Sequence, residues 1–211
     1  MPRQSPPRSE SLDGRVRRGA RNHEAIVRAI YELVSENHLP PTIDEVAERA
    51  GLGRRTVFRQ FRDLDALYRA MGERVMREAM ALVTLAAPTG SLETDLTALV
   101  GRRSRVFEHI TPFRRAARLV RHESTFLQEQ EKAMTMAFRA RLLGVLEPHV
   151  RVEGGDTIDV LELLLSFEAW ERLRHVQKVG VKRAREILLG AALTLVRSAV
   201  PRPVQVNGMG G

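Results

Sequence analysis

Residues 42–61 read TIDEVAERAGLGRRTVFRQF and contain two short helical patterns separated by a glycine-rich turn. Thr42 and Glu45 have the spacing of a capping box, in which each side chain accepts a hydrogen bond from the backbone at a helix start. The turn at residues 51–53 is too short to do more than set the next helix, residues 54–60, at a steep angle. The stretch therefore predicts a helix-turn-helix.

Helical periodicity dominates the rest of the chain as well, and no stretch alternates as a half-buried strand would, so we predict an all-α fold. The helices expected outside the quoted stretch cover residues 20–37, 63–86, 91–108, 112–122, 123–147, 156–177 and 182–198. Asp63 is expected to cap the first of those that follow the quoted stretch. Pro112 is expected to begin a new helix, because proline is favoured at the first helical position.

Composition favours a polyanionic partner. The 211 residues carry a net charge of +8 with a pI near 10.9, and only three of the 34 basic residues are lysine. Arginine suits phosphate and guanine edges, although a GC-rich genome explains the same ratio. The absence of cysteine fits a reducing compartment, and no apolar run approaches the ~20 residues of a membrane span. We expect a cytoplasmic protein without a membrane partner.

A helix-turn-helix places its second helix in the major groove of DNA, where arginine contacts guanine or phosphate and smaller side chains contact bases or backbone. The alternative is that the two helices form a corner of an ordinary helical domain. The residues that this geometry predicts to contact DNA are Arg54, Arg55, Thr56, Phe58, Arg59 and Gln60.

From residue 21 to residue 67 the chain resembles the DNA-binding domain of the TetR family of transcriptional regulators. The stretch TIDEVAERAGLGRRTVFRQFRDLDAL follows the family pattern Thr-x-x-x-Ile/Val-Ala-x-x-Ala-Gly-Val/Leu-Ser-x-x-Thr-Val/Leu-Tyr-x-His-Phe-x-x-Lys-x-x-Leu at nearly every position. Four positions differ, because Gly53, Phe58, Gln60 and Leu64 replace the usual serine, tyrosine, histidine and lysine. The resemblance adds Thr42, at the start of the first of the two helices, to the residues expected to contact DNA. It implies a homodimeric repressor that binds double-stranded, palindromic operator DNA and responds to an unknown small-molecule effector.

The same resemblance divides the chain into a helix-turn-helix domain at residues 20–68 and a helical effector-binding and dimerisation domain at residues 69–200. Residues 1–19 are expected to form a disordered basic arm, and residues 201–211 a disordered tail. Residues 1–21 contain six arginines against Glu10 and Asp13, a net charge of +4. Such an arm can follow the DNA backbone, or it can simply be a solvated tail.

The last two long helical patterns carry apolar residues on more than one side, which predicts a dimer interface, although both stripes could be internal core. The interface residues expected are Leu161, Leu165, Ile187, Leu188, Ala191 and Leu195. Aromatic and flexible apolar residues on the preceding helices are the candidates for an effector pocket: Phe107, Phe113, Phe126, Met134, Phe138 and Trp170. Residues 102–121 hold seven arginines against one acid, which favours a solvated face over an anion site.

Other chemistries find no support. The turn at residues 51–53 is not a dinucleotide fingerprint, because no strand precedes it and Thr56 stands where a third glycine belongs. The six histidines lack the spacing of zinc ligands. We therefore expect no enzyme, metal or cofactor. The alternatives that remain are a DNA-binding factor without an effector, controlled by a protein partner, and more distantly an all-α enzyme.

Overall fold

The computed structural model describes residues 8–82, 90–149 and 155–199, and these contain helices and turns but no strand. The all-α prediction is confirmed. In chain order the elements are α1 (Arg8–Ser35), α2 (Ile43–Ala50), α3 (Arg54–Gln60), α4 (Leu64–Ala81), α5 (Leu92–Val120), η1 (Arg121–Glu123), α6 (Thr125–Leu146), α7 (Gly155–Leu164), α8 (Phe167–Glu171), η2 (Arg172–Val176) and α9 (Val181–Ala199).

Contacts divide the chain into two units, and α5 and α6 each contribute to both. Unit 1 holds α1 to α4 with Ile110–Gln130, which comprise the end of α5, η1 and the start of α6. Unit 2 holds the start of α5, the rest of α6, and α7 to α9. The first division along the chain lies between Ala81 and Leu82. The boundary expected between residues 68 and 69 stays a prediction.

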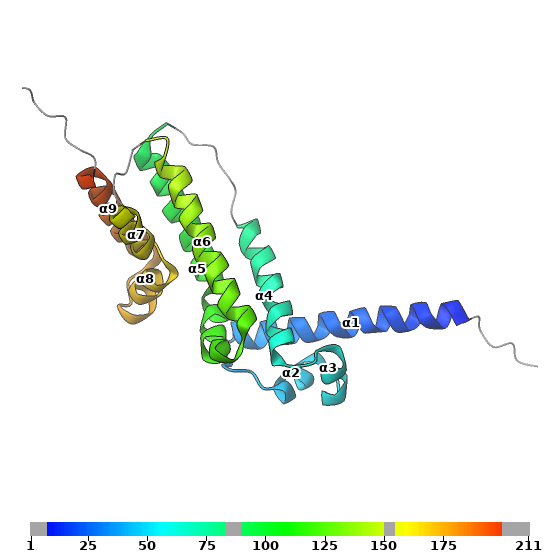
Figure 1. The fold of residues 1–211 in the computed structure, drawn as a ribbon. Coiled ribbons are helices and arrows are strands. Elements are labelled where there is room, and N and C mark those ends of the chain that lie inside the picture. The colour runs from blue at the N-terminus through cyan, green and yellow to red at the C-terminus, as the bar shows by residue number, and fades with distance from the viewer. Residues whose placement is uncertain (1–7, 83–89, 150–154, 200–211) are drawn as a thin grey trace, which may run out of the picture. The chain divides into compact units, whose positions relative to one another are not determined.

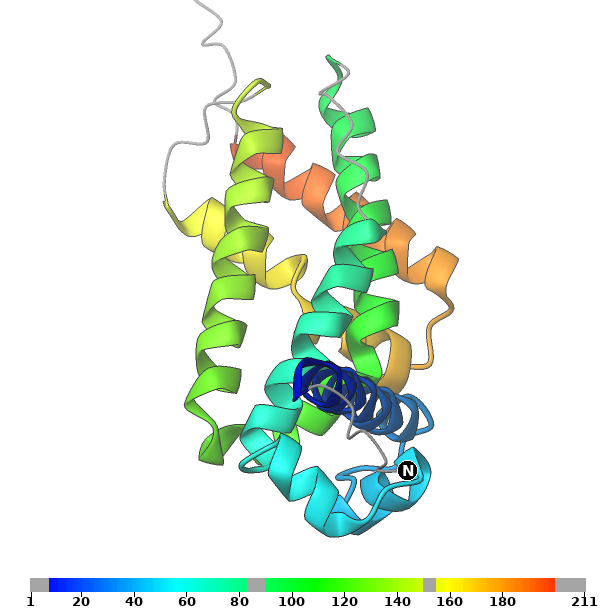
Figure 2. The same cartoon turned by 90° about the vertical axis from the view of Figure 1, so that its right-hand side faces the viewer.

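The core of unit 1 forms where α1 packs against α2, α3 and α4 (Figure 1). In Figure 2, which looks nearly along the axis of α1, α2 and α3 lie on one side of it. Ile26, Ile30 and Val34 repeat at intervals of four along α1 and have no exposed surface. Val46 of α2 and Val57 of α3 are equally buried, so apolar burial fixes both short helices on α1.

In unit 2, α7 packs beside α9 (Figures 1 and 2). Leu161 and Leu165 are buried, as are Ala184, Leu188 and Ala192, which repeat at intervals of four along α9. The spacing explains why α9 is amphipathic, with one buried stripe and an opposite side that is accessible.

The prediction of a disordered arm is wrong for residues 8–19, which are the first turns of α1. Pro7 immediately precedes α1, and no proline follows it until Pro40. The first residues of α1 include strong helix formers such as arginine, glutamate and leucine. A helix already anchored in the core extends easily, because only nucleation is costly. Residues 1–7 and the tail at residues 201–211 lie outside the described residues.

Two predicted helix boundaries are also wrong. Helix α5 continues through Pro112 instead of restarting there, because Ile110, Phe113 and Ala116 on either side of the proline are all buried and their packing outweighs one missing backbone bond. The segment expected as one helix at residues 156–177 is divided, because the Ser166 hydroxyl accepts a hydrogen bond from the Ala169 amide and starts α8 afresh.

Candidate nucleic-acid interface

Helix α2 is capped at both of its ends, and its C-terminal cap begins the turn to α3. At the start of α2 the predicted capping box is present, with Glu45 N donating to Thr42 Oγ1 over 3.2 Å and Thr42 N donating to Glu45 Oε2 over 2.7 Å. At its end Gly51 has φ of 65°, a left-handed conformation that favours glycine, and Leu52 N donates to Ala47 O over 2.9 Å. The chain is therefore turned sharply within three residues.

An exposed ion pair ties α2 to the end of α1. Both Arg49 guanidinium nitrogens Nη1 and Nη2 donate to the Glu36 carboxylate, each over 2.9 Å. The hydrogen bonds from Arg49 lower the pKa of Glu36 below its ordinary value. A bidentate contact of this kind fixes orientation more than it adds stability, because both groups are accessible to water.

Helix α3 presents two different faces. Val57 is completely buried and Phe61, which follows the helix, is 4% exposed. Arg55, Phe58 and Arg59 are spaced at i, i+3 and i+4, so they share the opposite side, and all three are exposed. Phe58 leaves 46% of its surface accessible, which is unusual for so large an apolar side chain. The outward face therefore combines two arginines with one aromatic ring.

The other residues predicted to contact DNA either have hydrogen-bond partners inside the protein or are partly buried. Arg54 donates from Nη1 to both carboxylate oxygens of Asp44, at 3.1 and 2.9 Å, and its guanidinium lies 5.5 Å from the centre of the Phe58 ring. The Thr42 hydroxyl is occupied in the capping box. Thr56 and Gln60 flank the outward face and are partly buried. Gly53 gives α3 no side-chain cap, as the sequence predicts.

Sequence reasoning identified the basic residues before the core as a possible DNA contact, but it missed that residues 8–19 are helical and that α1 passes beside α3. A Cβ atom at Gly19 of α1 would lie 4.0 Å from Gln60 Nε2, so α1 passes close to the end of α3. Arg15 lies one helical turn before Gly19, and Arg18 lies one turn before Asn22, so the two arginines are on the side of α1 that carries Gly19 and Asn22. Both arginines are exposed. In Figure 1 this blue end of α1 extends past α2 and α3. The absence of proline after Pro7 is the signal that could have revealed that this segment is helical.

Three of the predicted effector-pocket residues come together in unit 2. The Phe107 ring centre lies 5.3 Å from that of Phe138 and 6.4 Å from that of Trp170, and Phe167 joins the cluster at 5.7 Å. Phe107 and Trp170 are each 1% exposed, as expected of core side chains. Met134 lies on α6 and is partly buried.

Phe113 and Phe126 belong to unit 1 and have other neighbours. The Phe113 ring lies 4.9 Å from that of Tyr31, and the Arg69 guanidinium lies over the Phe126 ring at 4.0 Å. The six predicted pocket residues are therefore divided between the two units.

One arginine of residues 102–121 is buried, contrary to the expected solvated face. Arg103 is 4% exposed and donates to the carbonyl oxygens of Leu165 and Phe138. Burial lowers the pKa of Arg103 to about 10, partly offset by the charge of Glu162. The two carbonyl oxygens link α5 to α6 and to the residue after α7, whereas Arg103 Nε has no hydrogen-bond partner within the described residues.

Three residues predicted for the dimer interface are inside unit 2. Leu161, Leu165 and Leu188 have at most 4% of their surface exposed, so this part of the prediction is wrong. Their stripe is the internal one. Ile187, Ala191 and Leu195 remain accessible or partly accessible on α9. On α7 the accessible apolar residues are instead Val160 and Leu163.

No group of three or more histidine, aspartate or glutamate side chains in the described residues could hold a metal ion. In the same part of the chain, every helix is too short or too polar to cross a membrane.

No protein-family model matches the sequence, and no curated protein matches it either. The fold is similar to that of a solved structure, a transcriptional regulator from Rhodococcus sp. Rha1, with a TM-score of 0.63 and 18% sequence identity. The similarity covers 88% of this chain and 99% of the Rhodococcus chain. At this identity the comparison establishes a shared all-α fold.

Proposed function

We propose that the protein is a DNA-binding transcriptional regulator of the TetR type that acts as a homodimeric, ligand-responsive repressor. The observation that carries the proposal is the outward face of α3, where Arg55, Phe58 and Arg59 are exposed on a helix whose other side is anchored by Val57. A rigid helix of this kind fits the major groove, which admits one α-helix.

Charge supports the same proposal. The chain has a net charge of +8, and no ion pair joins Arg55 or Arg59 to an acid within the described residues. Such an arginine can make a bidentate contact with guanine without first breaking an ion pair inside the protein. The exposed Arg15 and Arg18 of α1 add positive charge next to α3 and would contact phosphates.

A homodimer would use the accessible side of α7 and α9. Leu163 is 69% exposed and Val160 is 49% exposed, although both are large apolar residues. Ile187, Ala191 and Leu195 of α9 repeat at intervals of four and are not buried. The same surface on two chains forms an isologous interface, and a two-fold protein suits a palindromic operator.

Ligand response would act through unit 1, where the DNA-contacting helix is short and is followed closely by α4. Only residues 61–63 separate α3 from α4, so a shift in the first turn of α4 changes the position of α3. A ligand that distinguishes two such positions by ~1 to 3 kcal/mol changes DNA affinity by ~5- to 150-fold.

Selection of bound sequences from a random pool of double-stranded DNA tests the proposal. We expect enrichment of a palindromic motif whose half-sites are centred about one helical turn of DNA, or a multiple of it, apart. A pool that stays random after repeated rounds would contradict sequence-specific binding, and a single unpaired half-site would contradict the dimer.

A further inference from the structure

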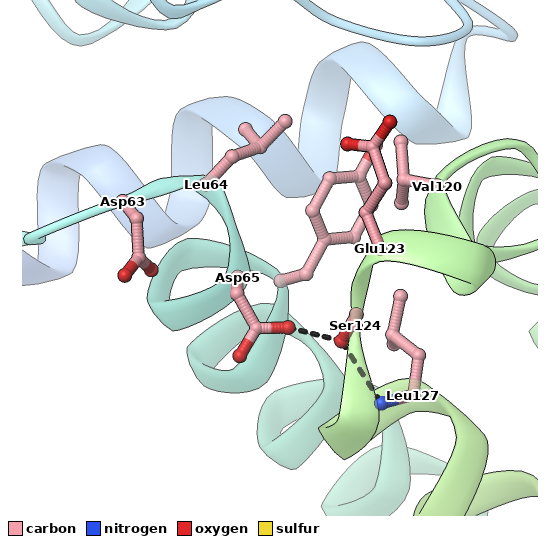
Figure 3. Close-up of a pocket in the computed structure, with 8 residues that line it drawn as sticks. Asp63, Leu64, Asp65, Val120, Glu123, Ser124 and Leu127 are labelled. Atoms are coloured by element: carbon pink, nitrogen blue, oxygen red, sulfur yellow. Dashed lines mark hydrogen bonds between the residues drawn. The ribbon is translucent and has the colours of Figure 1, made fainter.

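Unit 1 contains a cavity of about 290 Å³ between the start of α4 and the corner formed by the end of α5, η1 and the start of α6 (Figure 3). We propose that this cavity binds a small organic cation with an aromatic or alkyl body. None of the six residues predicted for the effector pocket lines it.

Tyr68 is the first observation that points to a ligand. It lines the cavity and is 1% exposed, yet within the described residues its hydroxyl has no hydrogen-bond partner. Buried polar groups almost always have partners, because an unsatisfied one costs roughly 1 to 3 kcal/mol. The hydroxyl oxygen itself is covered in the free protein, so a ligand with a polar group would satisfy it once the side chains over it shift.

The charge of the lining identifies the ligand class. Asp63, Asp65 and Glu123 line the cavity, in a protein whose net charge is +8. Arg69 offsets part of this charge, since its Nη2 lies 3.5 Å from Asp65 Oδ2, and His122 lies 3.2 Å from Glu123 and adds a positive charge when that histidine is protonated. The lining itself contains three carboxylates and no lysine or arginine, which favours a positively charged ligand.

The cation would be organic. These acids do not belong to any group in the described residues that could hold a metal ion. Leu64, Val120 and Leu127 supply apolar walls, which suit a hydrocarbon body. The volume would hold roughly ten non-hydrogen atoms, because a water occupies ~30 Å³. An arylalkyl ammonium ion has this size and combination of groups.

The cavity also lies where the start of α4 is hydrogen-bonded to the start of α6. Figure 3 shows the Asp65 carboxylate facing the Ser124 hydroxyl, which donates a hydrogen bond to it and accepts one from Leu127 N over 3.1 Å. This chain of bonds connects the first turn of α4 with the first turn of α6. Occupancy of the cavity would therefore affect α4, which follows α3 closely; this regulatory consequence rests on the proposed function.

Calorimetric titration with phenethylammonium tests the site directly, without DNA. We expect binding to the unmodified protein, with phenethyl alcohol and phenylacetate binding at least tenfold more weakly. Tyr68→Phe should reduce phenethylammonium affinity about tenfold without making the free protein less stable, because it removes a buried hydroxyl that has no partner.

The matched control is Tyr31→Phe. The Tyr31 hydroxyl donates to Glu78 Oε2 over 2.8 Å and does not line the cavity, so this variant should keep full affinity. Glu123→Gln, at an exposed position, should also weaken binding of the cation and leave the alcohol unaffected. Absence of binding at millimolar phenethylammonium, equal binding of all three compounds, or equal affinity of the Tyr68 and Tyr31 variants would overturn the proposal.

A separate titration measures DNA affinity with and without phenethylammonium. We expect phenethylammonium to change DNA affinity at least fivefold if a ligand in the cavity shifts α4 and with it α3. Tyr68→Phe should abolish this change. Binding of the ion without any effect on DNA affinity would overturn the regulatory consequence, whereas failure to bind any DNA would overturn the proposed function and leave the calorimetric result standing.

Discussion

At the scale of single residues, the three arginines of α3 are not equivalent. Arg54 already holds Asp44 through two hydrogen bonds and lies near the Phe58 ring. Arg55 and Arg59 share the outward face with that ring. Because Arg54 would have to give up this ion pair to bind DNA, it is better suited to orient α3, and the other two are better suited to contact bases.

The two glycines of the turn give a matched pair of substitutions. Gly51→Ala should lower the free energy of unfolding by about 1 kcal/mol, because an L residue is strained at φ of 65° even where nothing crowds its Cβ. Gly53→Ser should raise it by a few tenths of a kcal/mol, because Gly53 is an extended N-cap without a side-chain bond. Urea denaturation of both variants measures the difference, and equal effects in one direction would contradict this account of the turn.

Tyr68 predicts a dependence on alkaline pH. Burial raises the pKa of Tyr68 to about 12 from 10.0, so the folded state holds this proton more tightly than the unfolded chain does. The corresponding stability is complete below pH 10 and is lost as the pH rises towards 12. Tyr68→Phe should not show this loss and should become relatively more stable by roughly 2 kcal/mol.

Urea denaturation of the unmodified protein and Tyr68→Phe at about pH 9.5 and about pH 11.5 tests this. Other groups that titrate in the same range are common to both proteins and cancel in the difference. A difference between the two proteins that does not change with pH would contradict the burial of the hydroxyl.

At the scale of elements, local chemistry predicted most of unit 1. The capping box at Thr42 and the Asp63 cap of α4, which accepts from Ala66 N over 2.8 Å, depend only on residues three positions apart. Continuation of α5 through Pro112 depends instead on burial by distant segments, which periodicity cannot reveal. The break at Ser166 left a signal in the sequence, since serine is a good N-cap, but serine also occurs inside helices.

The basic end of α1 carries its own prediction. Arg15→Ala combined with Arg18→Ala should weaken binding to selected and scrambled DNA alike, because phosphate contacts position a protein without reading sequence. The slope of log affinity against log salt should become shallower by ~0.9 for each phosphate that the variant no longer neutralises. DNA titrations at several salt concentrations measure it.

The control for this pair is Arg183→Ala, at an exposed position of unit 2 where the arginine pairs with Glu186 at 3.3 Å. An unchanged slope for the Arg15 and Arg18 variant would show that this end of α1 does not touch DNA. A change in the preferred sequence would show that it reads a groove.

At the scale of the whole molecule, sequence alone could indicate that the last helices have two apolar sides, but not which side is internal. The side with Leu161 and Leu188 forms the core of unit 2, whereas Val160 and Leu163 remain accessible. The aromatic residues were ambiguous for the same reason, since Phe107 and Trp170 are as apolar in a core as in a pocket. Tertiary packing decides both questions, and the contacts between distant segments cannot be predicted from a single sequence.

Leu163→Glu should dissociate the proposed dimer, because it places a charge in the middle of an apolar surface. Met136→Glu is the matched control, since Met136 is 71% exposed and lies on α6, outside the proposed interface of α7 and α9. Sedimentation equilibrium at micromolar concentration should give a monomer for the first variant and a dimer for the second. A monomeric unmodified protein, or a dimeric Leu163→Glu variant, would contradict the interface.

The outward face of α3 is the central claim, and the affinity of Arg55→Ala combined with Arg59→Ala for the selected operator tests it most directly. Each bidentate base contact is worth ~1 to 3 kcal/mol, so the pair should weaken affinity at least tenfold and also discriminate less between operator and scrambled DNA. Circular dichroism and sedimentation should show unchanged helicity and assembly, with Arg183→Ala as the control. Operator affinity equal to that of the unmodified protein, in a variant that remains folded, would contradict the account.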